Sequence, residues 1–409
     1  MDRTRIARLF VVPALLASIV AAPAVTVVAQ EQDASPIATI EGSPQVTALP
    51  PVPAGAEVVA AGLDNPRHIA FGPDGALYIA EAGVGGDGPC VEGPEGDREC
   101  YGRSSAISRV DPVTGDRERV VEGVISRGIE GSGENATGIH DLAFVDDTLY
   151  AVIGVGADPN TRAEAEIEGP PQLGRLFAVD TETGELTEVA DIAGHEEGEN
   201  PDADNVDSNP YALDALPDGT LVVADAGGNS LLGVAPDGTI ETLAVFPVSM
   251  QAAPDGSEIP MQAVPNAVAV GPDGDLYVGQ LTGFPFPAGG ASVFRVPAGG
   301  GEPEPFAEGF TNIIDLAFGS DGGLYVLEFN AGGLTNIDPA DPTTLNGRLV
   351  RVAPEGAQEE IAGAGLIAPS GLAVGPDGRV YVAYLSVAPG AGTVVRFTAP
   401  DGGMATPEA

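Results

Sequence analysis

The chain contains no lysine, and all 17 of its basic residues are arginine. Against them stand 60 acidic residues, which give a formal net charge of −43 at pH 7. A field of this sign repels phosphate backbones and anionic lipid headgroups, so nucleic acids and membrane surfaces are excluded as expected partners. The charge itself indicates a highly soluble protein more than a specific ligand.

Long apolar runs are also scarce. The main one, at 9–22, follows three arginines near the start of the chain and precedes a small-residue pattern at 27–29. This order predicts a secretory signal peptide over residues 1–29 and an extracytoplasmic or secreted protein. The run is too short for a convincing membrane-spanning helix, and no later segment reaches the roughly 20 apolar residues needed. A retained N-terminal anchor stays open as the alternative.

Cysteine is nearly absent, with only Cys90 and Cys100 in one glycine-rich insertion. In an exported protein, two nearby cysteines most simply form a disulfide that closes their loop. A metal site at these two thiols is the weaker interpretation, because no histidine lies nearby to complete the ligand set.

One phrase recurs along the chain: an apolar strand, a Gly/Asp turn and a second apolar strand. A unit repeated at such periods is typical of propellers and solenoids. Each of the first five copies is followed by a second pair of strand-like segments, and four short strands joined by tight turns form one propeller blade. The copies occupy residues 69–83, 142–156, 212–228, 268–283, 316–333 and 372–386.

The last copy is followed by only one further strand-like segment, so its fourth strand is missing at the C-terminus. That strand is present at the other end of the chain, where EVVAAGL at 57–63 matches ERVVEGV at 118–124. The sequence therefore predicts an all-β, six-bladed propeller over residues 56–400, with the last blade closed by the N-terminal strand. Residues 30–55 are predicted to be a Pro/Ser/Ala-rich disordered linker, and 401–409 a disordered tail.

Polar residues gather just ahead of the inner strands, where a propeller has the mouth of its central channel. Convergent amide and carboxylate oxygens are what a calcium ion needs. Asparagine at the start of a strand also commonly caps a turn, which is the competing structural explanation. The candidate calcium ligands are Asn65, Asp141, Asn209, Asn266 and Asn312.

Two histidines lie at the same level, and His68 and His140 are candidate general bases. Neighbouring residues of a strand point to opposite faces, so we expect that His140 and Asp141 do not both face the channel. No nucleophile or oxyanion-binding group accompanies them. The acidic run at 195–207 lacks the glycine and closing glutamate of a calcium-binding EF-hand loop, and we interpret it as a solvated loop.

Several of these segments together resemble the secreted ScyD/ScyE proteins. The resemblance covers the whole predicted propeller, and its most specific parts are the cysteine loop and the DSNPY segment. It implies an exported six-bladed propeller of the NHL-like type, without an established reaction or catalytic residues. The segments that carry it are 58–67, 72–90, 100–102, 138–144, 154–159 and 207–232.

Three functions are compatible with this sequence. The main interpretation is a monomeric, non-catalytic binding or scaffolding propeller whose ligand is an unidentified protein or small molecule, because no complete catalytic set is present. The alternative is a calcium-dependent lactonase or esterase with its metal in the central channel. A third, a quinone-dependent sugar dehydrogenase, shares the architecture, but its basic cofactor-binding residues cannot be identified here.

Overall fold

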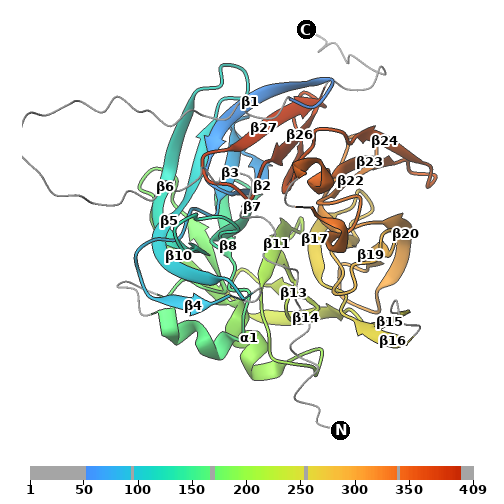
Figure 1. Ribbon diagram of the computed structural model, residues 1–409, viewed down its shortest axis with the longest axis horizontal. Coiled ribbons are helices and arrows are strands. Elements are labelled where there is room, and N and C mark those ends of the chain that lie inside the picture. The colour runs from blue at the N-terminus through green and yellow to red at the C-terminus, as the bar shows by residue number, and fades with distance from the viewer. Residues whose placement is uncertain (1–51, 94–95, 166–170, 253–256, 339–340, 398–409) are drawn as a thin grey trace, which may run out of the picture.

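A computed structural model describes residues 52–93, 96–165, 171–252, 257–338 and 341–397. Within them, six four-stranded antiparallel blades form a closed ring, as Figure 1 shows. The predicted all-β, six-bladed propeller is confirmed. The predicted signal peptide, nearly all of the linker and the C-terminal tail lie outside the described residues. No helix among the described residues is both long and apolar enough to cross a membrane.

Blades 1 to 3 each run from the channel outward in chain order. Their innermost strands carry almost no polar residue beyond their first few positions, because they are buried on both faces. The strands are β2 (Pro66–Phe71), β3 (Leu77–Glu81), β5 (Arg98–Val110) and β6 (Arg117–Ile129); β7 (Ile139–Val145), β8 (Thr148–Ile153), β9 (Arg175–Val179) and β10 (Leu186–Asp191); and β11 (Pro210–Ala215), β12 (Leu221–Asp225), β13 (Ser230–Val234) and β14 (Ile240–Val245).

Blades 4 to 6 repeat the same meander, and the sixth takes its outermost strand from the start of the chain. Their strands are β17 (Pro265–Val270), β18 (Leu276–Gln280), β19 (Ala291–Val296) and β20 (Glu304–Phe310); β21 (Ile313–Phe318), β22 (Leu324–Glu328), β23 (Arg348–Val352) and β24 (Gln358–Ala362); and β25 (Gly371–Val374), β26 (Val380–Tyr384), β27 (Gly392–Phe397) and β1 (Ala56–Leu63).

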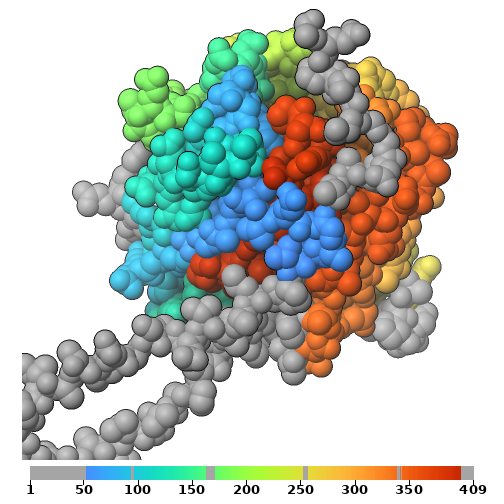
Figure 2. All heavy atoms as spheres, turned by 90° about the horizontal axis from the view of Figure 1, so that it is seen from above, coloured from blue at the N-terminus to red at the C-terminus, as the bar shows by residue number. Residues whose placement is uncertain are grey.

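The ring closes where β1 pairs antiparallel with β27, from Ala56 opposite Phe397 to Leu63 opposite Gly392. Figure 2 shows this seam, with the start of the described chain in blue against the C-terminal strands in red. Leu63 is fully buried. The predicted closure by the N-terminal strand is therefore confirmed, and it covers an edge of blade 6 that would otherwise be free to pair with other chains.

The repeated phrase builds the contacts between blades. Its tyrosine packs edge-to-face on a phenylalanine of a neighbouring inner strand, a favourable aromatic geometry. Its aspartate accepts a hydrogen bond from the same tyrosine in three blades. The ring pairs are Tyr78 with Phe144, Tyr277 with Phe318 and Tyr381 with Phe71, with centroids 5.1, 4.9 and 4.9 Å apart.

Insertions collect at the end of the ring where the inner strands begin. The predicted disulfide joins Cys90 to Cys100, which face each other across β4 and β5. The acidic run predicted to be a solvated loop instead starts within a helix, α1, whose Glu196 is buried; that prediction was wrong for its first part. The inserted elements are β4 (Cys90–Glu92), η2 (Pro159–Ala165), α1 (Ile192–Glu199), β15 (Ser249–Ala252), β16 (Glu258–Met261), η3 (Leu334–Asn336) and η4 (Pro342–Leu345).

Candidate functional site

A β-bulge near the start of the inner strands shapes the channel. In β7, Ile139 pairs with Ile153 but Asp141 pairs with the adjacent Val152, so His140 is an extra residue. A bulge places two consecutive residues opposite one, and both can turn to the same side. The expectation that His140 and Asp141 do not both face the channel assumed regular alternation, which this bulge interrupts. The same register shift occurs in β2, β11, β17 and β21.

His68 lies between two carboxylates at the centre of the ring. Its Nδ1 is 2.8 Å from Oδ2 of Asp141 and 3.7 Å from Oδ1 of Asp315, and all three side chains are buried. Burial alone would lower the pKa of His68, but attraction to Asp141 and Asp315 outweighs it and raises the pKa to about 9. His68 is therefore a cation at neutral pH and a poor general base.

The channel carboxylates also join neighbouring blades. Asp141 accepts the backbone N–H of Leu213 at 2.6 Å, and Asp315 accepts that of Leu372 at 2.6 Å, each on the next inner strand. Asp214 does the same with Val270 at 2.7 Å. Asp141 additionally accepts its own neighbour's N–H, so its oxygens are engaged by backbone donors and by His68.

His140 packs against the aromatic ring of Tyr211, with the ring centroids 4.7 Å apart. Its Nδ1 lies 3.1 Å from the carbonyl oxygen of Pro210. Burial and then the charge of Arg67 lower the pKa of His140 to about 3, so this imidazole stays neutral. Arg67 is itself buried and donates to the carbonyl oxygens of Ser386 and Ala136. It fixes positive charge beneath Tyr211.

Two cavities open along the axis, one at each end of the inner strands. The lower cavity has a volume of about 370 Å³ and is lined by all six inner strands. Five of the six inner strands contribute an alanine to its wall, among them Ala70, Ala143 and Ala317, and Asp214 stands at the equivalent position of the sixth. Burial raises the pKa of Asp214 to about 6.

The larger space, which we call the channel-mouth pocket, has a volume of about 460 Å³ and lies where insertions surround the start of the inner strands of blades 3 and 4. This volume is within the range of small-molecule sites. One wall is polar and one is apolar. The polar wall contains Asn205, Asp207, Asn209, Asn229, Gln262 and Asn266, and the other contains Tyr211, Leu281, Ile314, Phe329 and Leu334.

Part of the polar wall is held rigidly. Asn229 donates to Oδ2 of Asp202 at 3.0 Å and to Oε1 of Gln262 at 2.5 Å. Gln262 in turn donates to Oδ2 of Asp204 at 2.9 Å. These bonds connect the acidic loop after α1 to the connection between blades 3 and 4. The pocket therefore has one preorganised wall.

Two other amides of the pocket have buried groups without partners. Oδ1 of Asn209 has no partner, and Nδ2 of Asn266 has none at hydrogen-bond geometry, although it points to the phenol oxygen of Tyr211. Buried polar atoms are normally paired, so an unpaired acceptor and an unpaired donor in one pocket suit a ligand that carries both a hydroxyl and a carbonyl group.

The remaining predicted calcium ligands lie elsewhere. Asn65 donates to the carbonyl oxygens of Gly83 and Gly133, and Asn312 donates to that of Leu281. Both have a positive φ of 48°, the left-handed conformation that asparagine tolerates better than most residues. They hold turns, as the competing explanation stated. The structure thus brings together only Asn209 and Asn266 of the five proposed ligands.

The donors at the mouth offer limited support for a resident calcium ion. Among the described residues, the only three His, Cys, Asp or Glu groups within 4.8 Å of one another are Cys90, Cys100 and Glu130. Both sulfurs there form the disulfide, so they are not free ligands. A calcium ion at the mouth would rest on Asp207 with the amide oxygens of Asn209 and Asn266, a donor set with a single negative charge.

Sequence reasoning missed Asp207, Tyr211 and Asp315 as site residues. The first two belong to the DSNPY segment, and their position directly before and within β11 was the available signal. Asp315 was detectable by aligning the repeats, because IIDLAF at 313–318 matches IHDLAF at 139–144 and aligns Asp315 with Asp141.

No protein-family model matches the chain, and no curated protein matches its sequence. Several solved structures do match the fold of this chain. A putative glucose dehydrogenase from Thermus thermophilus is 20% identical, with 84% of this chain and 99% of that chain covered and a TM-score of 0.49. The PQQ-bound aldose sugar dehydrogenase from Streptomyces coelicolor is 15% identical over 85% and 98%, with a TM-score of 0.50. The calcium-binding regucalcin from Agrobacterium tumefaciens is 16% identical over 84% and 93%, with a TM-score of 0.47. At 15% identity, the likeness to the Streptomyces coelicolor structure shows a shared fold and nothing more.

Proposed function

We propose that the protein is a hydrolase of small, uncharged lactones or esters, and that the channel-mouth pocket is its active site. The observation that carries the proposal is the unpaired pair in this pocket, Oδ1 of Asn209 as acceptor and Nδ2 of Asn266 as donor. A hydroxylated lactone has a hydroxyl for the first and a carbonyl for the second. The apolar wall with Phe329 would cover the face of its ring.

Asp207 is the proposed general base. It lines the pocket, and although the residue is exposed, desolvation by the protein around its carboxyl raises the pKa of Asp207, with Asp158 and Asp202 adding to the effect. A carboxylate with a raised pKa is a better acceptor for a proton from water. Hydroxide then bonds to the carbonyl carbon, the C–O bond to the leaving alkoxide breaks, and the alkoxide takes the proton from Asp207.

Tyr211 and Asn266 are the proposed hydrogen-bond donors to the carbonyl oxygen as negative charge develops there. Burial raises the pKa of Tyr211, so its phenol stays protonated and able to donate. The positive charge of buried Arg67 favours the same charge development from below. A calcium ion bound by Asp207, Asn209 and Asn266 would supply Lewis-acid polarisation of that carbonyl.

The test is hydrolysis of p-nitrophenyl acetate and of a panel of five- and six-membered lactones by the mature chain. Asp207→Asn should lower kcat by about 10²-fold or more. Asp218→Asn, which makes the same change at an exposed turn of the same blade, should leave kcat unchanged. Tyr211→Phe should lower kcat more than it alters KM.

The competing binding function makes a different prediction. Lactones that bind to the wild-type chain with measurable heat but are not turned over would refute the hydrolase proposal and support a binding protein. Turnover that survives Asp207→Asn unchanged would refute the assigned base.

A further inference from the structure

Blade 3 differs from blades 1 and 5 in the groups that surround a buried carboxylate. In blades 1, 3 and 5 the second strand ends in a fully buried carboxylate, Glu81, Asp225 or Glu328. Each accepts a backbone N–H from the residues that lead into the inner strand of its own blade. The three side chains therefore perform the same structural task at equivalent places.

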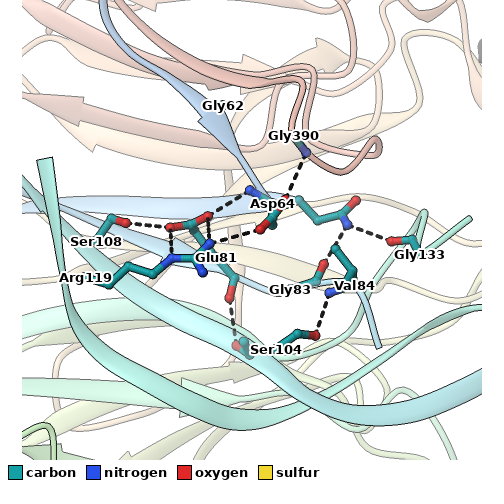
Figure 3. Close-up of polar contacts among 12 residues, drawn as sticks. Gly62, Asp64, Glu81, Gly83, Val84, Ser104, Ser108, Arg119, Gly133 and Gly390 are labelled. Atoms are coloured by element: carbon teal, nitrogen blue, oxygen red, sulfur yellow. Dashed lines mark hydrogen bonds and ion pairs between the residues drawn. The ribbon is translucent and has the colours of Figure 1, made fainter. Parts of the chain in front are cut away.

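Blades 1 and 5 neutralise this carboxylate with arginine. Figure 3 shows Glu81 accepting hydrogen bonds from Ser108 and Arg119, with Arg119 Nη2 3.0 Å from Oε2. Glu328 is held by both Nε and Nη2 of Arg348, at 2.8 and 2.7 Å. A buried carboxylate without such a partner is strongly destabilising, so these arginines balance the charge.

Blade 3 has no arginine at this place. The residue opposite Asp225 across the ladder is Ser230, whereas the residue opposite Glu328 is Arg348. Among the described residues, Asp225 accepts hydrogen bonds only from Ser208 and from backbone N–H groups. Its negative charge is hydrogen-bonded but has no counter-charge.

The structure instead adds a second carboxylate. Glu196 of α1 is only 1% exposed, and neither of its oxygens has a hydrogen-bond partner. A Cβ on Gly228 would lie 2.7 Å from Oε2 of Glu196 and 3.4 Å from Cγ of Asp225, so glycine leaves open the space between the two carboxylates. Burial, and then repulsion by Asp225, raises the pKa of Glu196 to about 7.

The hydroxyl of Ser230 is also buried and without a partner. The nearby Arg162 does not compensate these charges, because it pairs with Asp191 and Glu197. Three buried oxygens, two of them on one carboxylate, thus lie in the surroundings of Asp225 without a partner at hydrogen-bond geometry, and the backbone N–H of Asp207 is near Glu196. Leaving them empty costs the desolvation of each.

We propose that Glu196, Asp225 and Ser230 form a calcium site that ties α1 to blade 3. All of its donors are oxygens, which selects a hard cation, and their irregular arrangement suits calcium better than magnesium, which demands near-ideal octahedral geometry. Water would complete the coordination shell. This site is separate from the channel mouth and does not depend on the proposed hydrolase function.

The test is titration of the metal-free mature chain with CaCl₂, followed by calorimetry and by thermal unfolding. Wild type should bind one equivalent at this site, and a 100-fold excess over Kd should raise Tm by roughly 5 °C. Glu196→Gln should lose both the heat and the rise in Tm. Glu197→Gln, the adjacent and partly exposed position on the same helix, should keep both.

Glu196→Gln also removes the repulsion between the two carboxylates, so without calcium this variant should melt above wild type at pH 8. Asn266→Ala separates this site from a channel metal, since it should leave the calcium response unchanged. Calcium binding that survives Glu196→Gln but is lost in Asn266→Ala would overturn the proposal in favour of a channel metal. A wild-type Tm that ignores calcium but falls between pH 6 and 8 would overturn it in favour of a shared proton.

Discussion

The charge of His68 at the centre of the ring can be tested by removing its nearer partner. In Asp141→Asn the carboxylate 2.8 Å from Nδ1 is replaced by a neutral amide, and only Asp315 at 3.7 Å still attracts the imidazole. The desolvation that opposes the charge remains, because His68 is 2% exposed. We therefore expect the pKa of His68 to fall from about 9 by at least about one unit.

The raised pKa of His68 also contributes to the unfolding free energy of the protein. Raising the pKa of His68 from 6.5 to about 9 corresponds to about 3 kcal/mol of unfolding free energy, at about 1.4 kcal/mol per unit. Because the folded value is above the unfolded one, this contribution is complete below pH 6.5 and is lost as the pH rises through 9. Wild type should accordingly lose about 3 kcal/mol over this window through His68, and Asp141→Asn clearly less.

Two measurements check this prediction. The chain has only three histidines, so NMR titration can follow His68 directly. Urea unfolding at about pH 6.5 and about pH 10, on either side of the two pKa values, gives the stability. Asp214→Asn is the matched control, since Asp214 also accepts backbone N–H groups of two inner strands, and no ion pair joins it to a histidine in the described structure. A wild-type His68 that titrates near 6.5, or one that stays near 9 in Asp141→Asn, would refute the reasoning.

Two further predictions concern the scaffold. A truncated chain that begins at Asp64 lacks β1 and with it buried Val59 and Leu63, so its Tm should fall by roughly 10 °C relative to a chain that begins at residue 52; an unchanged melting curve would contradict ring closure. Arg348→Met leaves fully buried Glu328 without its arginine and should cost about 3 kcal/mol in urea unfolding. The matched change at the more exposed pair, Arg351→Met, should cost less than about 1 kcal/mol, and equal losses would contradict the role of burial.

The sequence predicted the scaffold well because the scaffold rests on local signals. Each blade begins with a hairpin whose Asp-Gly turn and alternating strands lie within one short phrase. Ring closure was also within reach, since the strand at 57–63 resembles the outer strand at 118–124 and no other segment completes blade 6. The helix α1 was missed because its sequence, IAGHEEGE, contains two glycines and no apolar face.

The site was less accessible because it depends on departures from regular structure. Strict alternation would place His140 and Asp141 on opposite sides of β7, and the bulge opposite Val152 removes that regularity where Asp141 meets His68. Such a bulge has no dependable mark in a single sequence. The asparagines could not be told apart for a different reason. Asn65 and Asn209 both lie just before an inner strand, and only tertiary contacts decide that Asn65 holds a turn while Asn209 lines a pocket.

A repeat also supplies a comparison that a single-copy fold lacks. Blades 1 and 5 show what the buried carboxylate at the end of the second strand requires, namely an arginine. Blade 3 keeps the carboxylate, has serine at the position of Arg348, and receives a second acid from α1. The scaffold is the same in all three blades, so this difference in charge has no structural purpose in the chain alone. It is best explained by a positively charged group from outside the chain. Such a group would bind beside the channel-mouth pocket, whose volume already suits a small molecule.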